Sequence, residues 1–168
     1  MSGYVSKGRD EHIDPSIPCL YYFPMAGRAD LSRLIAAAGG LELQEVSERP
    51  VHIGEFGSPG SLPVLEHENM KIAQSTAVEA YLSSIAPKFA SLTPQQRAVD
   101  LHFCAIKEDV LAGLAKELFA GKDPIKIVAH LDKWCSVIEA ILPEEGFVNG
   151  LEYPTPADLA VLNSESST

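Results

Sequence analysis

The sequence of 168 residues has few cysteines, no long apolar run and no cluster of basic residues. Its three cysteines, Cys19, Cys104 and Cys135, are too few and too far apart for a disulfide framework. The same spacing excludes a C-x-x-C redox or zinc motif. We therefore expect all three to be buried as small hydrophobic residues, and we expect no bound metal.

No stretch approaches the roughly 18 consecutive apolar residues that a membrane-spanning helix needs, and the first residues lack the apolar core of a signal peptide. Lysine and arginine number 13 against 23 acidic residues, and this formal charge of −10 would repel nucleic acids and membrane surfaces. Because 46% of the residues are hydrophobic, the chain can bury a real core. These features predict a cytoplasmic globular protein that binds neither nucleic acid nor membrane.

The N-terminal half alternates strand and helix signals. Residues 1–17 are polar and aperiodic, so we expect a flexible extension there. Cys19–Phe23 is typical of a short buried strand, residues 28–40 of a helix that ends at two glycines, and Leu41–Glu48 of an alternating strand. A strand, a helix and a second strand predict a βαβ unit with parallel strands. The glycines and prolines of Arg49–Gly60 predict an exposed loop or a broken short helix.

The segment 61–75 is the most distinctive part of the sequence. Pro63 stands in a short apolar run, Leu62–Leu65, where it marks a strand start, a sheet edge or a cis peptide bond. A turn is expected at Asn69–Met70, followed by a second short strand over residues 71–73.

Gln74–Ser75 then opens a helix in which Thr76 and Glu79 have the spacing of a capping box. The free N–H groups and the positive dipole end of such a helix start can hold a carboxylate.

The C-terminal half is entirely helical. Thr93 is a natural N-cap for a long helix that runs to Phe119, and Asp123 precedes a second helix with a wide apolar seam. Thr155 and Asp158 have capping spacing before a third helix, for which we expect only a turn or two. The predicted fold is therefore an α/β domain over residues 18–87, a short linker, and an all-α domain over residues 93–168.

This order of elements resembles the cytosolic glutathione transferases, and in particular their sigma-like, tyrosine-type class. Four segments support the resemblance: the Y-F-x-x-x-G-R-A pattern at 22–29, the cis-proline motif at 62–65, the pair Gln74–Ser75, and the helix cap at 155–158. The match covers about residues 19–163. It implies a thioredoxin-like N-terminal domain, a homodimer, and a chain truncated at its C-terminus, since the family's helical domain continues for about three more helices.

The resemblance also implies roles for individual residues. Tyr22 would donate a hydrogen bond to the sulfur of glutathione and so favour the thiolate, which is the nucleophile. Tyr21 is its rival, but neighbours on a strand face opposite sides and the family pattern places the functional tyrosine directly before Phe23. Ser75, with Gln74 beside it, would bind the γ-glutamyl carboxylate of glutathione.

Further residues complete the implied site. Leu62 would offer its backbone to the cysteinyl part of glutathione, provided that the bond to Pro63 is cis, as in the family. Arg28 resembles the family's arginine near the catalytic tyrosine. Glu108 matches the position from which a second subunit reaches the glutathione amino group, although the family usually has aspartate there. Asp100 lies two turns earlier on the same helix.

The loop that holds the glycine end of glutathione departs from the family pattern, which has a tryptophan and a lysine where this chain has Pro50 and Gly54. Two functions therefore stay open. The first is a detoxification enzyme that transfers glutathione to a hydrophobic electrophile, or uses it in isomerisation or peroxide reduction. The second is a non-catalytic homologue with a binding or structural role. A thiol oxidoreductase that uses Cys19 is disfavoured, because this cysteine lies inside a strand rather than at a helix N-terminus.

Overall fold

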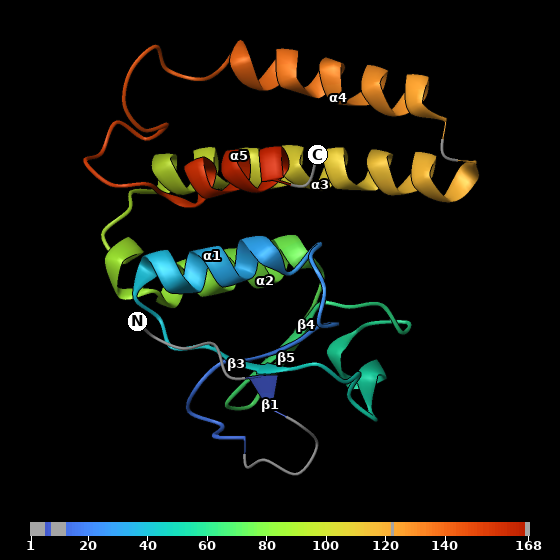
Figure 1. The fold of residues 1–168 in the computed structure, drawn as a ribbon. Helices are drawn as coiled ribbons and strands as arrows, with labels where there is room; N and C mark the ends of the chain where they lie inside the picture. The colour runs from blue at the N-terminus through green and yellow to red at the C-terminus, as the bar shows by residue number, and fades with distance from the viewer. Residues whose placement is uncertain (1–5, 8–12, 122, 167–168) are drawn as a thin grey trace. The chain divides into compact units, whose positions relative to one another are not determined.

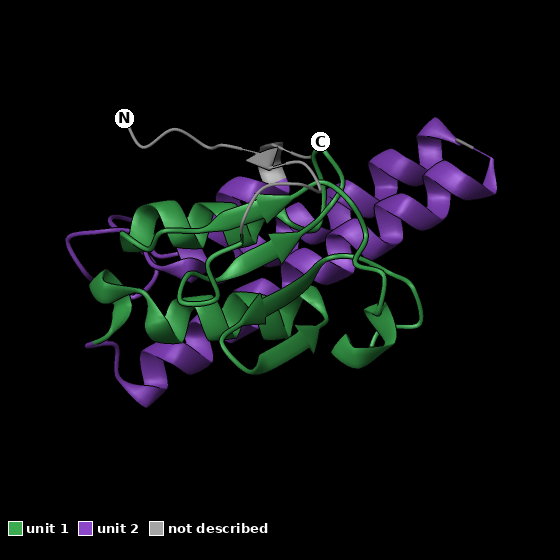
Figure 2. Cartoon of the chain, turned by 90° about the horizontal axis from the view of Figure 1, so that it is seen from below, with its two compact units in different colours: residues 1–90 green, residues 91–168 purple. Residues whose placement is uncertain are grey.

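The computed structural model describes residues 6–7, 13–121 and 123–166. The chain divides into two compact units, residues 1–90 and 91–168 (Figure 2). Over the described residues, no helix is both long enough and apolar enough to cross a membrane.

The first unit is built on a mixed five-stranded sheet in the order β1-β3-β2-β4-β5. Its strands are β1 (Ser6–Lys7), β2 (Cys19–Tyr21), β3 (Gln44–Val46), β4 (Val64–His67) and β5 (Met70–Ala73). Helix α1 (Asp30–Gly39) connects β2 to β3, which are parallel, so the predicted βαβ unit is confirmed. Strand β4 is antiparallel to β2 and β5, and the turn between β4 and β5 falls one residue earlier than expected.

Helices α1 and α2 (Ser75–Ile85) lie side by side over one face of this sheet (Figure 1). The strands and these helices bury a set of apolar side chains completely: Leu20, Leu65, Leu31, Ile35, Val78 and Leu82. A second cluster includes Tyr21, Leu62 and Phe56. Phe56 comes from the 3₁₀ helix η1 (Ile53–Phe56), which confirms the short broken helix expected in the loop 49–60.

Parts of the predicted N-terminal extension are structured. Strand β1 pairs with β3 in parallel, and the Asp14 N–H donates to Gln44 Oε1 at 3.1 Å. The Gln44 amide in turn donates to the Asp14 carbonyl at 2.7 Å. The rest of that prediction, residues 1–5 and 8–12, lies outside the described residues.

The predicted linker after Pro87 is also packed. The 3₁₀ helix η2 (Pro87–Phe89) brings Phe89 into full burial, where its ring faces the backbone of Gly39 at the end of α1. A side-chain carbon at Gly39 would lie 3.0 Å from this ring.

The second unit contains α3 (Pro94–Ala120), α4 (Pro124–Glu139) and α5 (Pro156–Ser166). Both predicted N-caps are confirmed. Thr93 forms a complete capping box with Gln96, and the Asp123 carboxylate accepts from the Ile125 N–H at 3.0 Å. Helix α5 runs for 11 residues and is longer than the predicted turn or two.

Asp100 fastens α3 to the start of α5. Its Oδ1 accepts from Thr155 Oγ1 at 2.8 Å, from Asn149 Nδ2 at 2.9 Å and from the Ala157 N–H at 3.0 Å. Asp158 Oδ2 accepts from the Thr155 N–H at 2.7 Å, which confirms the predicted cap. Burial raises the pKa of Asp100, and its hydrogen bonds oppose this rise. Asp100 is therefore a buried structural residue of the second unit.

The predicted apolar seam of α4 is only partly covered. Only Ile138 is buried, whereas Val128 and Ile141 are exposed. Within the described residues α4 packs on α3, where His130 Nε2 lies 3.0 Å from the Val110 carbonyl and the ring covers Gly113. Cys135 is exposed on this helix, which corrects the expectation of three buried cysteines; Cys19 and Cys104 are buried, and the three cysteines form no disulfide with one another.

Candidate functional site

The register of the sheet brings several predicted site residues to one edge. Tyr21 pairs with Val64, and Val64 pairs with Ala73. Continuing both antiparallel pairs by one residue places Tyr22 opposite Pro63, and Pro63 opposite Gln74. The end of β2, the start of β4 and the end of β5 therefore meet at the same edge of the sheet, where α2 begins.

The Leu62–Pro63 peptide bond is cis, as the resemblance implied. The side chain of Leu62 is only 8% exposed and belongs to the apolar cluster with Tyr21 and Phe56. With this side chain buried, the group that Leu62 can offer to a ligand is its backbone.

Helix α2 begins at Gln74–Ser75, as predicted, but its cap differs from the prediction. Gln74 is the N-cap, with φ of 75° and ψ of 118°, and its carbonyl accepts from the Val78 N–H at 3.0 Å. The predicted capping box of Thr76 and Glu79 is wrong, because Thr76 lies inside the first turn. The Gln74 side chain makes no capping hydrogen bond. A positive φ at a residue other than glycine costs about 1–3 kcal/mol and is typical of ligand-binding sites.

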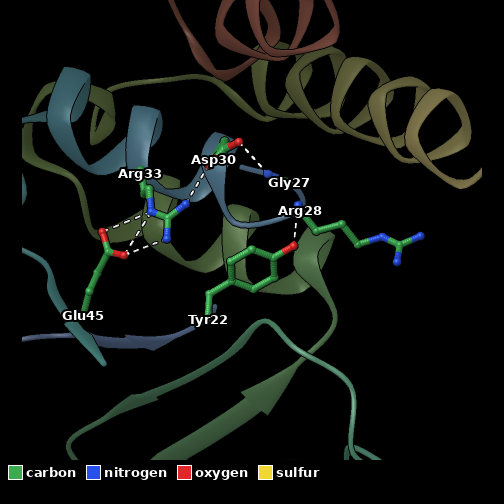
Figure 3. Close-up of polar contacts among 6 residues, drawn as sticks. All are labelled: Tyr22, Gly27, Arg28, Asp30, Arg33 and Glu45. Carbon is green, nitrogen blue, oxygen red and sulfur yellow. Dashed lines mark hydrogen bonds and ion pairs between the residues drawn. The ribbon is translucent and has the colours of Figure 1, made fainter. Parts of the chain in front are cut away.

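Tyr22 is half-buried at this edge, directly after β2 (Figure 3). Its hydroxyl oxygen accepts a hydrogen bond of 3.0 Å from the backbone N–H of Arg28. Gly27 lies against the same oxygen, since a Cβ atom at this position would be 2.5 Å from it. The phenol oxygen is thus held by the backbone of the loop between β2 and α1.

Tyr21 is directed elsewhere. Its ring packs edge-on against Phe56, and its hydroxyl donates to Glu66 Oε2 at 3.3 Å. Burial raises the pKa of Tyr21, and the neighbouring Cys19 and Glu66 raise it further. Of the two tyrosines, Tyr22 is therefore the one that the register places opposite Pro63 and whose hydroxyl contacts the loop before α1.

The other predicted site residues belong to other segments of the chain. The backbone of Arg28 contacts Tyr22, but its side chain extends away from the tyrosine (Figure 3). Glu108 lies in the second unit, on α3, where its carboxylate accepts from Lys107 Nζ at 2.7 Å. Gly54, which replaces a family residue at the glycine end, is exposed in η1 and has no side chain to offer a ligand.

Sequence reasoning missed three charged residues beside Tyr22. Asp30 Oδ2 accepts from the Gly27 N–H at 2.7 Å, and Asp30 Oδ1 accepts from Arg33 Nη1 at 2.6 Å. Arg33 also donates to Glu45 from Nε and Nη2, each at 2.9 Å from Oε2. The spacing of Asp30 and Arg33 was a signal for a helical ion pair, but nothing local pointed to Glu45.

Comparison with known proteins gives a consistent set of relatives. No protein-family model matches the chain. The chain is 28% identical over 91 residues to glutathione S-transferase A1 of Bos taurus and 26% identical over 91 residues to glutathione S-transferase alpha-2 of Rattus norvegicus. Each match covers 51% of this chain and 41% of the relative, so the chain matches about two fifths of the length of these curated relatives.

Solved structures match over most of the chain. A glutathione S-transferase from Ascaris lumbricoides has a TM-score of 0.70 and 26% identity, with 90% of this chain and 80% of that one covered. A glutathione transferase homologue from Drosophila mojavensis, solved with bound glutathione, has a TM-score of 0.72 and 26% identity, with 90% and 77% covered. A monomeric glutathione S-transferase from Necator americanus matches the fold at a TM-score of 0.71 and 23% identity, with 90% and 80% covered.

Proposed function

Because this chain is a relative of the glutathione S-transferases and has their fold, we propose that its first unit binds glutathione and that Tyr22 stabilises the thiolate of that ligand. The proposal is that of an enzyme which transfers glutathione to a hydrophobic electrophile or uses it in isomerisation. The observation that carries it is the hydrogen bond from the Arg28 N–H to the Tyr22 hydroxyl oxygen.

This hydrogen bond prepares Tyr22 to act as a donor. Because a lone pair of the oxygen already accepts from the Arg28 N–H, the O–H is left to donate to another acceptor. A sulfur atom placed at the sheet edge would be such an acceptor, and a hydrogen bond to the charged form of a thiol lowers its pKa. Each unit of pKa is worth about 1.4 kcal/mol, or a tenfold change in the thiol equilibrium.

The start of α2 suits the carboxylate at the glutamyl end of glutathione. The first backbone N–H groups of a helix have no partners within it, and the dipole favours an anion there. Gln74 adopts its positive φ at this point, and Ser75 is the first helical residue. The backbone of Leu62, directly before the cis bond, would pair with the cysteinyl part in the manner of an added strand.

Two further parts of the proposal rest on the family resemblance. The Y-F-x-x-x-G-R-A segment supports assignment to the sigma-like class, which acts in the cytoplasm. The chain would act as a homodimer in which Glu108 of a second copy approaches the glutathione amino group. In this chain the Glu108 carboxylate accepts a hydrogen bond from Lys107 Nζ at 2.7 Å.

The experiment that tests the proposal compares Tyr22→Phe with Tyr21→Phe. We expect Tyr22→Phe to raise the pKa of the bound glutathione thiol toward its ordinary value of about 8.5 and to lower the rate of conjugation with a generic aryl halide by at least about tenfold. The thiolate is followed by its ultraviolet absorption, and binding by retention on glutathione-agarose.

Tyr21→Phe is the matched control, because it removes the same group from the adjacent residue, whose hydroxyl is bonded to Glu66. It should leave both the thiol pKa and the rate unchanged. Retention on the resin without any rate that depends on Tyr22 would instead identify a non-catalytic glutathione-binding homologue. If the wild-type chain is not retained on the resin, both the enzyme and the non-catalytic glutathione-binding homologue are refuted.

A further inference from the structure

The loop between β2 and α1 has two successive backbone N–H groups with different partners. The N–H of Gly27 donates to Asp30 Oδ2 at 2.7 Å, and the N–H of Arg28 donates to the Tyr22 hydroxyl at 3.0 Å (Figure 3). Because both groups belong to one short segment, the position of the Asp30 carboxylate affects the direction in which the next N–H points.

Asp30 is itself held by Arg33. The guanidinium of Arg33 donates to Asp30 Oδ1 at 2.6 Å and makes a forked contact with the carboxylate of Glu45 on β3. Exposure of the three side chains is low, at 21% for Arg33, 24% for Asp30 and 13% for Glu45. Such forked, charge-assisted hydrogen bonds are stronger than neutral ones and fix orientation as well as distance.

Arg33 also contacts Tyr22 directly. Its guanidinium carbon lies 5.6 Å from the centroid of the tyrosine ring, within the range of a cation–π interaction. Arg33 therefore contacts the Tyr22 ring, whereas Asp30 is linked to the Tyr22 hydroxyl through the backbone of residues 27 and 28. We name Asp30, Arg33 and Glu45 the brace.

The charge of the brace indicates how it acts. Two carboxylates face one guanidinium, so the three side chains carry a net charge of −1 and supply no positive field to stabilise an anion at Tyr22. Burial alone lowers the pKa of Arg33, but its contacts with Glu45 and Asp30 raise it above the ordinary value, so Arg33 stays charged. The contribution of the brace is therefore geometric.

We propose that Asp30 and Arg33 are positioning residues for Tyr22. They hold the loop backbone so that the Arg28 N–H donates to the Tyr22 hydroxyl oxygen, which leaves the O–H to face the sheet edge. This inference rests on the proposed function of Tyr22. It extends that function to two residues of α1 that do not contact the ligand, and it predicts that their effect on chemistry passes through the tyrosine alone.

The test is a double-mutant cycle between Asp30→Ala and Tyr22→Phe. We expect Asp30→Ala to raise the pKa of the bound glutathione thiol by up to about one unit and to lower kcat at neutral pH by up to about tenfold, with the Kd for glutathione changed less than about twofold. In the Tyr22→Phe background, Asp30→Ala should have no further effect on the thiol pKa.

Two other variants separate positioning from stability. Asp30→Asn keeps an oxygen for the Gly27 N–H but loses the ion pair with Arg33, so we expect a smaller shift of the thiol pKa; it also serves if Asp30→Ala does not fold. Asp123→Ala is the matched control, because Asp123 likewise accepts a backbone N–H and pairs with a base, Lys126, at a helix start in the second unit. It should lower Tm and leave the thiol pKa unchanged.

The outcomes distinguish the proposed function of Tyr22 from the positioning role of Asp30 and Arg33. If Tyr22→Phe does not shift the thiol pKa, the proposed function and the positioning role are both wrong. If Tyr22→Phe shifts it but the Asp30 variants do not, only the positioning role is wrong. Additive effects of Asp30→Ala and Tyr22→Phe would likewise show that Asp30 acts independently of the tyrosine.

Discussion

Replacement of Gly27 by alanine tests the Tyr22 geometry most directly. The Cβ of Gly27→Ala would lie 2.5 Å from the Tyr22 hydroxyl oxygen, whereas ordinary van der Waals contact begins near 3.4 Å. The two atoms must therefore separate by about 0.9 Å. A displacement of about 1 Å at a reacting group costs roughly 100-fold in rate. We expect kcat for conjugation to fall by roughly 10- to 100-fold, and the pKa of the bound thiol to rise.

The same substitution also strains the backbone, because Gly27 has a φ of +152°. Gly40→Ala is the control for this effect: Gly40 has a φ of +71°, and a Cβ there would meet nothing within 4 Å. Both variants should lose about 1–2 kcal/mol of unfolding free energy in chemical denaturation. Only Gly27→Ala should lose activity in the conjugation assay. Equal rates for the two variants would refute the conclusion that the position of the Tyr22 oxygen matters.

Two further predictions concern backbone strain and buried charge. Gln74→Gly should raise the unfolding free energy by about 1 kcal/mol through relief of the positive φ, yet weaken glutathione binding about tenfold in calorimetry through loss of the amide; unchanged affinity would exclude Gln74 from the site. Because burial raises the pKa of Asp100 in the folded chain, its contribution to stability is present at low pH and lost as pH rises through that raised value. The unfolding free energy of the wild type relative to Asp100→Asn should therefore fall with rising pH in urea titrations, and a constant difference would contradict this assignment.

The elements that were predicted correctly are those whose sequence pattern and stabilising contacts lie within a few residues of each other. Thr93 caps α3 through a partner three residues along, and Asp123 caps α4 through a partner two residues along. The βαβ unit follows similarly from one strand, one helix and one strand in succession. In each case the physical cause and the pattern occupy the same short segment, so no knowledge of distant contacts is needed.

The predictions that failed depended on neighbours that the pattern could not identify. The helix opening at Gln74–Ser75 is confirmed, but the capping box of Thr76 and Glu79 is not, because the positive φ of Gln74 turns the chain from β5 directly into the helix and leaves Thr76 inside its first turn. The apolar seam of α4 predicted burial, which requires a packing partner along the whole length of that face. Of the described residues, α3 provides a surface for one part of α4 and leaves Val128 exposed.

The candidate site shows the same division between local and distant causes. Alternation along β2 predicts that Tyr21 and Tyr22 face opposite sides, and their separate contacts with Phe56 and with the Arg28 N–H agree with this. The choice of Tyr22 as the functional residue came from the family resemblance and stays a prediction. The hydrogen-bonding pattern of the Tyr22 hydroxyl could not be predicted from this alternation. It depends on Glu45, which lies 12 residues from Arg33 along the chain and reaches it because β3 lies beside β2. It depends also on the backbone N–H of residue 28, which every residue type except proline supplies, so no side chain at that position could indicate the bond.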